Sequence, residues 1–179
     1  MRLFFSIFCL LIASSLWSQD YESILWDKGH RLSWTDFKGK PGAPSRAAAI
    51  TASGISYQFS TLESDSNLEL DFTVSTYFYP TKSWYQPEVC DEVILSHEQL
   101  HFDISELFAR KMRKLLGETK FTRNVKAEVK TIYRQINKEL AEFQHLYDDE
   151  TNFSRNREKQ QLWNKKIAEA LKQGKTIQF

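Results

Sequence analysis

Two stretches in the first half of the chain alternate hydrophobic and polar positions with the period of two that is typical of a half-buried β-strand. The first covers residues 47–59, and its hydrophobic positions are Ile50, Ala52, Ile55, Tyr57 and Phe59. The second covers residues 68–79 and alternates more regularly, through Leu68, Leu70, Phe72 and Val74. The two stretches are neighbours in sequence and each has strand periodicity, so we expect an antiparallel pair.

Beyond residue 80 the hydrophobic positions recur every three or four residues, which indicates amphipathic helices. A first helix is predicted from Pro87 to Leu116, because a proline followed by acidic residues is typical of a helix start and Gly117 suits a C-cap. A second helix is predicted over residues 122–146. A third follows the polar break at 148–154 and runs to Gly174. This order predicts an α+β fold, with a small antiparallel β-sheet followed by three helices.

Residues 1–18 have the pattern of a secretory signal peptide. Met1 and Arg2 precede an apolar stretch, residues 3–13, that is shorter than the roughly 20 residues needed to cross a bilayer. Cys9 lies within this stretch behind the bulky Phe8, which disfavours lipid attachment. We therefore expect an exported protein, periplasmic or extracellular, with residues 19–179 as one domain and no transmembrane segment in the mature chain.

Positive and negative charges balance along the chain, with 24 Lys and Arg residues against 23 Asp and Glu residues. This balance argues against the basic surface that binding to nucleic acid or to an anionic membrane requires. For Cys90 we expect a packing role, and His30 is interpreted as a surface residue. The aromatic and turn-rich segment 24–42 is expected to form a lid or a packed N-terminal segment.

The predicted first helix contains His97-Glu98-Gln99-Leu100-His101, the pattern H-E-x-x-H. At about 100° per residue, the two histidines differ by only about 40° in direction, so both imidazoles can bind one metal ion. Imidazole ligands at this spacing favour Zn²⁺, and Glu98 lies beside them as a base for a zinc-activated water. Two histidines that only line a core are the alternative interpretation.

A catalytic zinc site needs a third protein ligand, which must come from another segment. Asp103 and Glu106 point about 160° and 140° away from His101 on the helix, so we expect ion pairs or supporting contacts for them. The acidic segment 147–151 follows the second helix, where the chain turns back toward the first.

Within that segment Asp148 is our first choice as the third ligand, and the further candidates are Glu150, Asp149 and His145. A solvated turn that caps the third helix is the alternative for these acidic residues. Tyr147 is a candidate catalytic residue that donates a hydrogen bond to a developing oxyanion, with a buried anchor as the alternative.

The chain resembles the DUF922 family of exported bacterial domains, described as predicted secreted zinc-dependent proteases. Three segments carry the resemblance: Leu32 to Gly39, Ser96 to Asp103, and Tyr147 to Thr151 with the later Gln160 and Trp163. The resemblance implies that His97 and His101 bind zinc, that Glu98 is the catalytic base, and that Tyr147, Asp148 and Thr151 form a second functional segment. A His-Gly pair follows this threonine in the family pattern, whereas this chain has Asn152, Phe153 and Ser154.

Together these observations predict an exported, zincin-like metallopeptidase that hydrolyses peptide bonds in a peptide or protein substrate. If the strand at 68–79 forms a sheet edge, it could align an extended peptide beside the site. Two alternatives remain: an exported binding module that keeps the metal without turnover, which the missing His-Gly pair favours, and a structural zinc protein.

Overall fold

A long β-hairpin forms the base of the fold. The computed structural model describes residues 22–42, 46–64 and 67–173. Strands β3 (Ser53–Ser64) and β4 (Asn67–Phe78) pair antiparallel along their whole length, from Ser53 opposite Phe78 to Ser64 opposite Asn67. Alternate side chains on one face are buried, among them Ile55, Val74 and Phe78. The predicted antiparallel pair is therefore confirmed.

Three two-residue strands complete the sheets. Strand β1 (Ile24–Leu25) pairs with the end of β4, which gives the order β1-β4-β3. Strand β2 (Ala49–Ile50) pairs with β5 (Trp84–Tyr85) in a separate sheet. The condition that 68–79 forms a sheet edge is not met at Tyr77 and Phe78, because β1 pairs with these two residues, and the backbone N–H of Trp26 donates to the carbonyl of Thr76.

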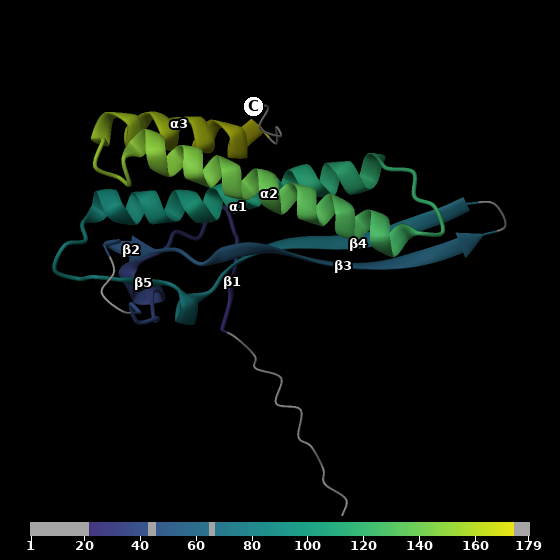
Figure 1. Cartoon of the computed structure of the whole chain (residues 1–179), viewed down its shortest axis with the longest axis horizontal. Coiled ribbons are helices and arrows are strands. Elements are labelled where there is room, and N and C mark those ends of the chain that lie inside the picture. Colours follow the sequence, from purple (N-terminus) through teal and green to yellow (C-terminus); the bar gives the residue numbers. More distant parts are fainter. Residues whose placement is uncertain (1–21, 43–45, 65–66, 174–179) are drawn as a thin grey trace, which may run out of the picture.

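Three helices follow, and the first of them lies in the centre of the molecule. Helix α1 (Glu92–Glu118) runs between the hairpin and the layer formed by α2 (Val125–Thr151) and α3 (Arg157–Gln173), as Figure 1 shows. A helix covered on both sides is buried around its whole circumference. Residues 97–109 of α1 are accordingly all buried except the partly buried His101. The predicted α+β order of strands and then three helices is confirmed.

The helix boundaries differ from the prediction, and three of the differences bear on the site or on its neighbouring helices. Helix α1 begins at Glu92 rather than Pro87, because the carboxylate of Asp91 accepts hydrogen bonds from the backbone N–H groups of Val93 and Ile94. Gly117 lies within α1 instead of capping it. Helix α2 continues through Thr151, so residues 148–151 of the predicted polar break are helical.

The aromatic N-terminal segment is packed against α1 and is not a lid. Leu32, Phe37, Phe78 and Phe102 form a buried cluster. The backbone carbonyls of Thr81 and Ser83 approach Gly39 so closely that a Cβ atom there would lie 2.9 and 2.8 Å from their oxygens. Only glycine fits this approach without a shift.

The predicted signal peptide, with Cys9, lies outside the described residues. Within the residues that the structure describes, no helix combines the length and the apolar character that a membrane span requires.

Candidate metal centre

Three potential ligand atoms meet at one point between α1 and α2. Nε2 of His97 lies 3.2 Å from Nε2 of His101, and Oδ1 of Asp148 lies 3.1 and 3.0 Å from these two nitrogens. The histidines are one turn apart on α1, and Asp148 reaches them from α2. Ligands bound about 2.0–2.1 Å from a tetrahedral zinc ion are about 3.3 Å from one another, so this triangle has the size of a zinc site.

The electrostatics of the three groups favour a bound positive charge. Burial by itself lowers the pKa of His101, but the contact with Asp148 and the charges of Glu98 and Asp148 outweigh burial and raise that pKa above its ordinary value of 6.5. Burial by itself raises the pKa of Asp148, but the contacts with both imidazoles bring it well below its ordinary value of 3.8. The cluster therefore attracts a proton or a metal cation.

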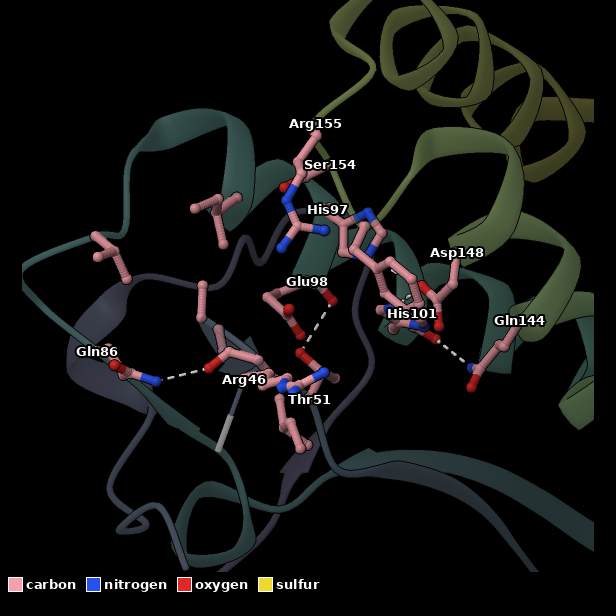
Figure 2. Close-up of a pocket in the computed structure, with 17 residues that line it drawn as sticks. Arg46, Thr51, Gln86, His97, Glu98, His101, Gln144, Asp148, Ser154 and Arg155 are labelled. Carbon is pink, nitrogen blue, oxygen red and sulfur yellow. Dashed lines mark hydrogen bonds and ion pairs between the residues drawn. The ribbon is translucent and has the colours of Figure 1, made fainter. Parts of the chain in front are cut away.

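Glu98 lies beside the cluster in a pocket with a volume of about 860 Å³. Its side chain is buried, and Oε2 has no hydrogen-bond partner among the described residues. Thr51 fixes the local backbone by donating a hydrogen bond from Oγ1 to the carbonyl of Glu98. Figure 2 shows Glu98 in the pocket between the metal cluster and the segment that holds Thr51. A buried carboxylate whose residue lines a cavity beside two imidazoles is suited to accept a proton from a small molecule there.

A hydrogen-bond network behind His97 fixes the orientation of its ring. Nδ1 of His97 lies 3.0 Å from Oε1 of Gln160, a buried residue of α3. Because the amide oxygen can only accept, Nδ1 carries the proton and Nε2 is free to bind a metal. The Tyr147 ring stacks on His97 with 4.5 Å between ring centroids, and its hydroxyl lies 2.8 Å from Nε2 of Gln160.

Tyr147 is fully buried, and its hydroxyl contacts Gln160 and the backbone carbonyl of His97. Burial raises the pKa of Tyr147 far above its ordinary value. Its side chain is absent from the described lining of the pocket. These contacts favour the buried-anchor interpretation, and the catalytic role stays a prediction.

Of the four candidate third ligands, only Asp148 reaches the histidines. Asp149, Glu150 and His145 are exposed, and Glu150 instead accepts a hydrogen bond from Nε1 of Trp163. The alternative of a solvated turn is wrong for Asp148, because this residue lies within α2 and its side chain is 20% exposed. The cap of α3 is provided by Asn156, whose Oδ1 accepts from the backbone N–H of Lys159.

The acidic residues excluded as ligands form supporting ion pairs, as predicted. Asp103 pairs with Arg31 at 3.0 Å and also accepts from Nε1 of Trp26. Glu106 pairs with Arg110 and Arg113 at 3.0 and 2.9 Å.

The other two sequence assignments also agree with the structure. Cys90 donates from its thiol to the carbonyl of Ala48 and is not part of the metal cluster, and burial raises its pKa. His30 is exposed.

Sequence reasoning assigned no role to Gln160 or to the two arginines that line the pocket, Arg46 and Arg155. Gln160 carried a signal, because it is a polar residue at helical spacing from Trp163 and Ile167 on the buried stripe of α3. No sequence pattern indicated the position of the arginines, because they lie in connections whose conformation depends on tertiary contacts.

Residues 81–155 match the family model DUF922, whose description is "Bacterial protein of unknown function". The matched range contains both histidines, Glu98 and Asp148, so the region of resemblance and the metal cluster coincide. The match supports the family label. Comparisons with curated proteins and with solved structures gave no match.

Proposed function

We propose that this protein is an exported zinc-dependent peptidase, with His97, His101 and Asp148 as metal ligands and Glu98 as general base. The observation that carries the proposal is the meeting of three ligand atoms within 3.2 Å of one another beside a buried carboxylate in a pocket. A third ligand from α2 gives the set of three that a catalytic zinc site needs.

The residues present fit a zinc ion. Two imidazole nitrogens and one carboxylate oxygen are typical zinc ligands. Oδ1 of Asp148 is buried without a hydrogen bond in the described part of the chain, although it contacts both rings. An ion at this point would compensate the buried carboxylate, and Gln160 holds His97 in the tautomer that a metal requires.

When bound, zinc supplies a Lewis acid that polarises the scissile carbonyl and makes water more acidic. The Glu98 carboxylate, which lines the pocket, would accept a proton from the attacking water as the new C–O bond forms. The same carboxylic acid would then protonate the amine nitrogen as the C–N bond breaks, which returns Glu98 to its charged form.

A peptide substrate is favoured by the strand on the pocket wall. Residues 47–51, which include β2, line the pocket, and β2 has a strand neighbour on one side only in its two-stranded sheet. An extended peptide can pair with such an edge through backbone hydrogen bonds, independently of its sequence. This role replaces the one expected for 68–79.

The first test is the zinc content of the purified mature chain, measured by elemental analysis. Wild type should hold about one zinc, and His97→Ala and Asp148→Asn should lose it. Asp149→Asn is the matched control, because it removes the same charge from the exposed neighbouring position and should keep the zinc. A wild-type protein that holds no zinc after reconstitution would overturn the metal assignment.

The second test separates the peptidase from a binding module that has the same metal. Glu98→Gln should keep the zinc and lose hydrolysis of a peptide library followed by mass spectrometry, because the amide cannot accept the proton. If wild type binds zinc and cleaves nothing, the module is the better interpretation. The structural alternative predicts loss of folding when zinc is removed.

A further inference from the structure

Two guanidinium groups face the same pocket from different segments. Arg155 comes from the connection between α2 and α3, and Arg46 from the segment that precedes β2. Figure 2 shows the Arg155 side chain directed toward Glu98 from one wall, with Arg46 on the other side of Glu98 in this view. Both arginines are exposed and line the pocket, so their positive charges are accessible to a ligand there.

The α2–α3 connection is built so that Arg155 lies at the pocket. Asn152, Phe153 and Ser154 all have positive φ angles, of 49°, 52° and 71°. Such a run is unfavourable for residues other than glycine, so contacts must hold it in place. The N–H of Phe153 donates to the carbonyl of Asp148, and the N–H of Asn156 donates to that of Thr151. This compact turn presents Phe153 and Arg155 over the end of the helix that holds Asp148.

The charge of the pocket then favours an anionic group on the substrate. Its carboxylates are Glu98 and Asp148, and Asp148 is engaged with the two imidazoles. With a divalent ion bound, the positive charge of the ion and the two arginines is larger than the negative charge of these two carboxylates. Arginine binds a carboxylate through paired N–H···O hydrogen bonds, which are among the strongest that a side chain makes.

Exposed apolar side chains stand beside these charges on the pocket lining. Ile50, Val89 and Phe153 are 43%, 57% and 56% exposed. These three side chains can contact an apolar residue of the substrate that lies next to its anionic group.

We propose that the pocket selects peptides that carry a carboxylate, which Arg155 binds with help from Arg46. This inference rests on the proposed peptidase function, because the carboxylate is the anionic group that an unmodified peptide contains. It can be a free C-terminus or an Asp or Glu side chain, and the two sources are distinguished by the probe peptides.

The test measures binding without turnover, in zinc-loaded Glu98→Gln protein. Three fluorescent probes share one apolar sequence: the first has a free C-terminal carboxylate, the second a C-terminal amide, and the third a C-terminal amide with one internal Glu. At least one acidic probe should bind about tenfold more tightly than the neutral amide. Preference for the first probe identifies the C-terminus, and preference for the third identifies an acidic side chain.

Further substitutions, made in the Glu98→Gln protein, test whether the arginines cause the preference for acidic probes. Adding Arg155→Gln should abolish the tenfold preference, and Arg155→Lys should restore only part of it. Arg134→Gln is the matched control, because this substitution removes the same charge. Arg134 is exposed on α2 and is absent from the pocket lining. It should keep the full preference.

Equal binding of the three probes, no measurable binding, or a preference that survives the combined loss of Arg46 and Arg155 would overturn the inference. Failure of the proposed function has a different signature, because a wild-type protein that binds zinc and cleaves no peptide still gives a result in the binding assay. Cleavage of all three probes with equal kcat/KM would leave the peptidase intact and remove the carboxylate preference.

Discussion

Replacement of Gln160 by leucine tests how far the network behind His97 determines zinc affinity. The side chain of Gln160 is 2% exposed and contacts three partners: Nδ1 of His97, the hydroxyl of Tyr147, and Oδ1 of Asn164. Leucine has a similar size but no polar atoms. The substitution therefore leaves the Nδ1–H of His97 without its acceptor, while the Tyr147 hydroxyl keeps its contact with the carbonyl of His97.

Two effects follow, one on zinc affinity and one on folding stability. Loss of the partner that orients a histidine ligand weakens metal binding by about 10- to 100-fold. That change equals about 1.4–2.7 kcal/mol of binding free energy. A buried N–H without a partner also costs about 1–3 kcal/mol of folding stability, which the zinc-free protein will show in a urea titration.

The assay is a zinc competition titration against a chromophoric chelator, carried out on Gln160→Leu and on two comparison variants. Gln161→Leu makes the same chemical change at the exposed neighbouring position and should bind zinc as wild type does. Gln160→Glu keeps an acceptor for the Nδ1–H and should bind zinc at least as tightly as wild type. If Gln160→Leu is less stable but has unchanged zinc affinity, Gln160 is only a packing residue and the reasoning fails.

Three further predictions concern the support of the site and its protonation. Asp103→Asn should lower the free energy of unfolding by about 1.5–3 kcal/mol and leave the zinc content unchanged, because Asp103 is a buried ion-pair partner and not a ligand. Gly39→Ala should cost about 1–3 kcal/mol in the same urea titration, since its Cβ would meet two carbonyl oxygens at 2.8 and 2.9 Å, and an unchanged midpoint would contradict this. In the zinc-free protein, the pKa of Asp148 is lowered and that of His101 is raised, so their contact stabilises the fold most between their ordinary values of 3.8 and 6.5. The stability advantage over Asp148→Asn should fall as pH rises through the raised pKa of His101 or drops through the lowered pKa of Asp148, and a pH-independent difference would refute this assignment.

The part of the site that could be predicted depends on local geometry. The spacing of His97, Glu98 and His101 on one helix is enough to place their side chains close together. The motif therefore predicted these three residues without knowledge of any tertiary contact. Asp148 was the first choice among four candidates rather than a unique one, because the polar residues after 146 resembled a turn. Following the buried stripe from Phe143 to Tyr147 and Thr151 would have extended α2. Asp148 then lies on the same helix as Gln144, one turn later, and both line the pocket.

The part of the fold that could not be predicted depends on pairing between distant segments. Strands β1, β2 and β5 have two residues each, too few for a period of two to be recognised. Each exists because another strand lies beside it, as β1 does beside Phe78. The prediction joined β2 to β3 and did not foresee that β1 pairs with β4, so it did not recognise that β4 lies between two strands.

The division between helices and connections suggests where this site can change. The proposed ligands and Glu98 lie on α1 and α2, and the central position of α1 fixes His97, Glu98 and His101 among packed side chains. Phe153, Arg155 and Arg46 lie in connections on the rim, which tolerate substitution better than a buried helix does. Changes at the rim should therefore alter which peptides bind while the zinc content stays constant, whereas changes on the buried face of α1 should alter zinc binding and stability together.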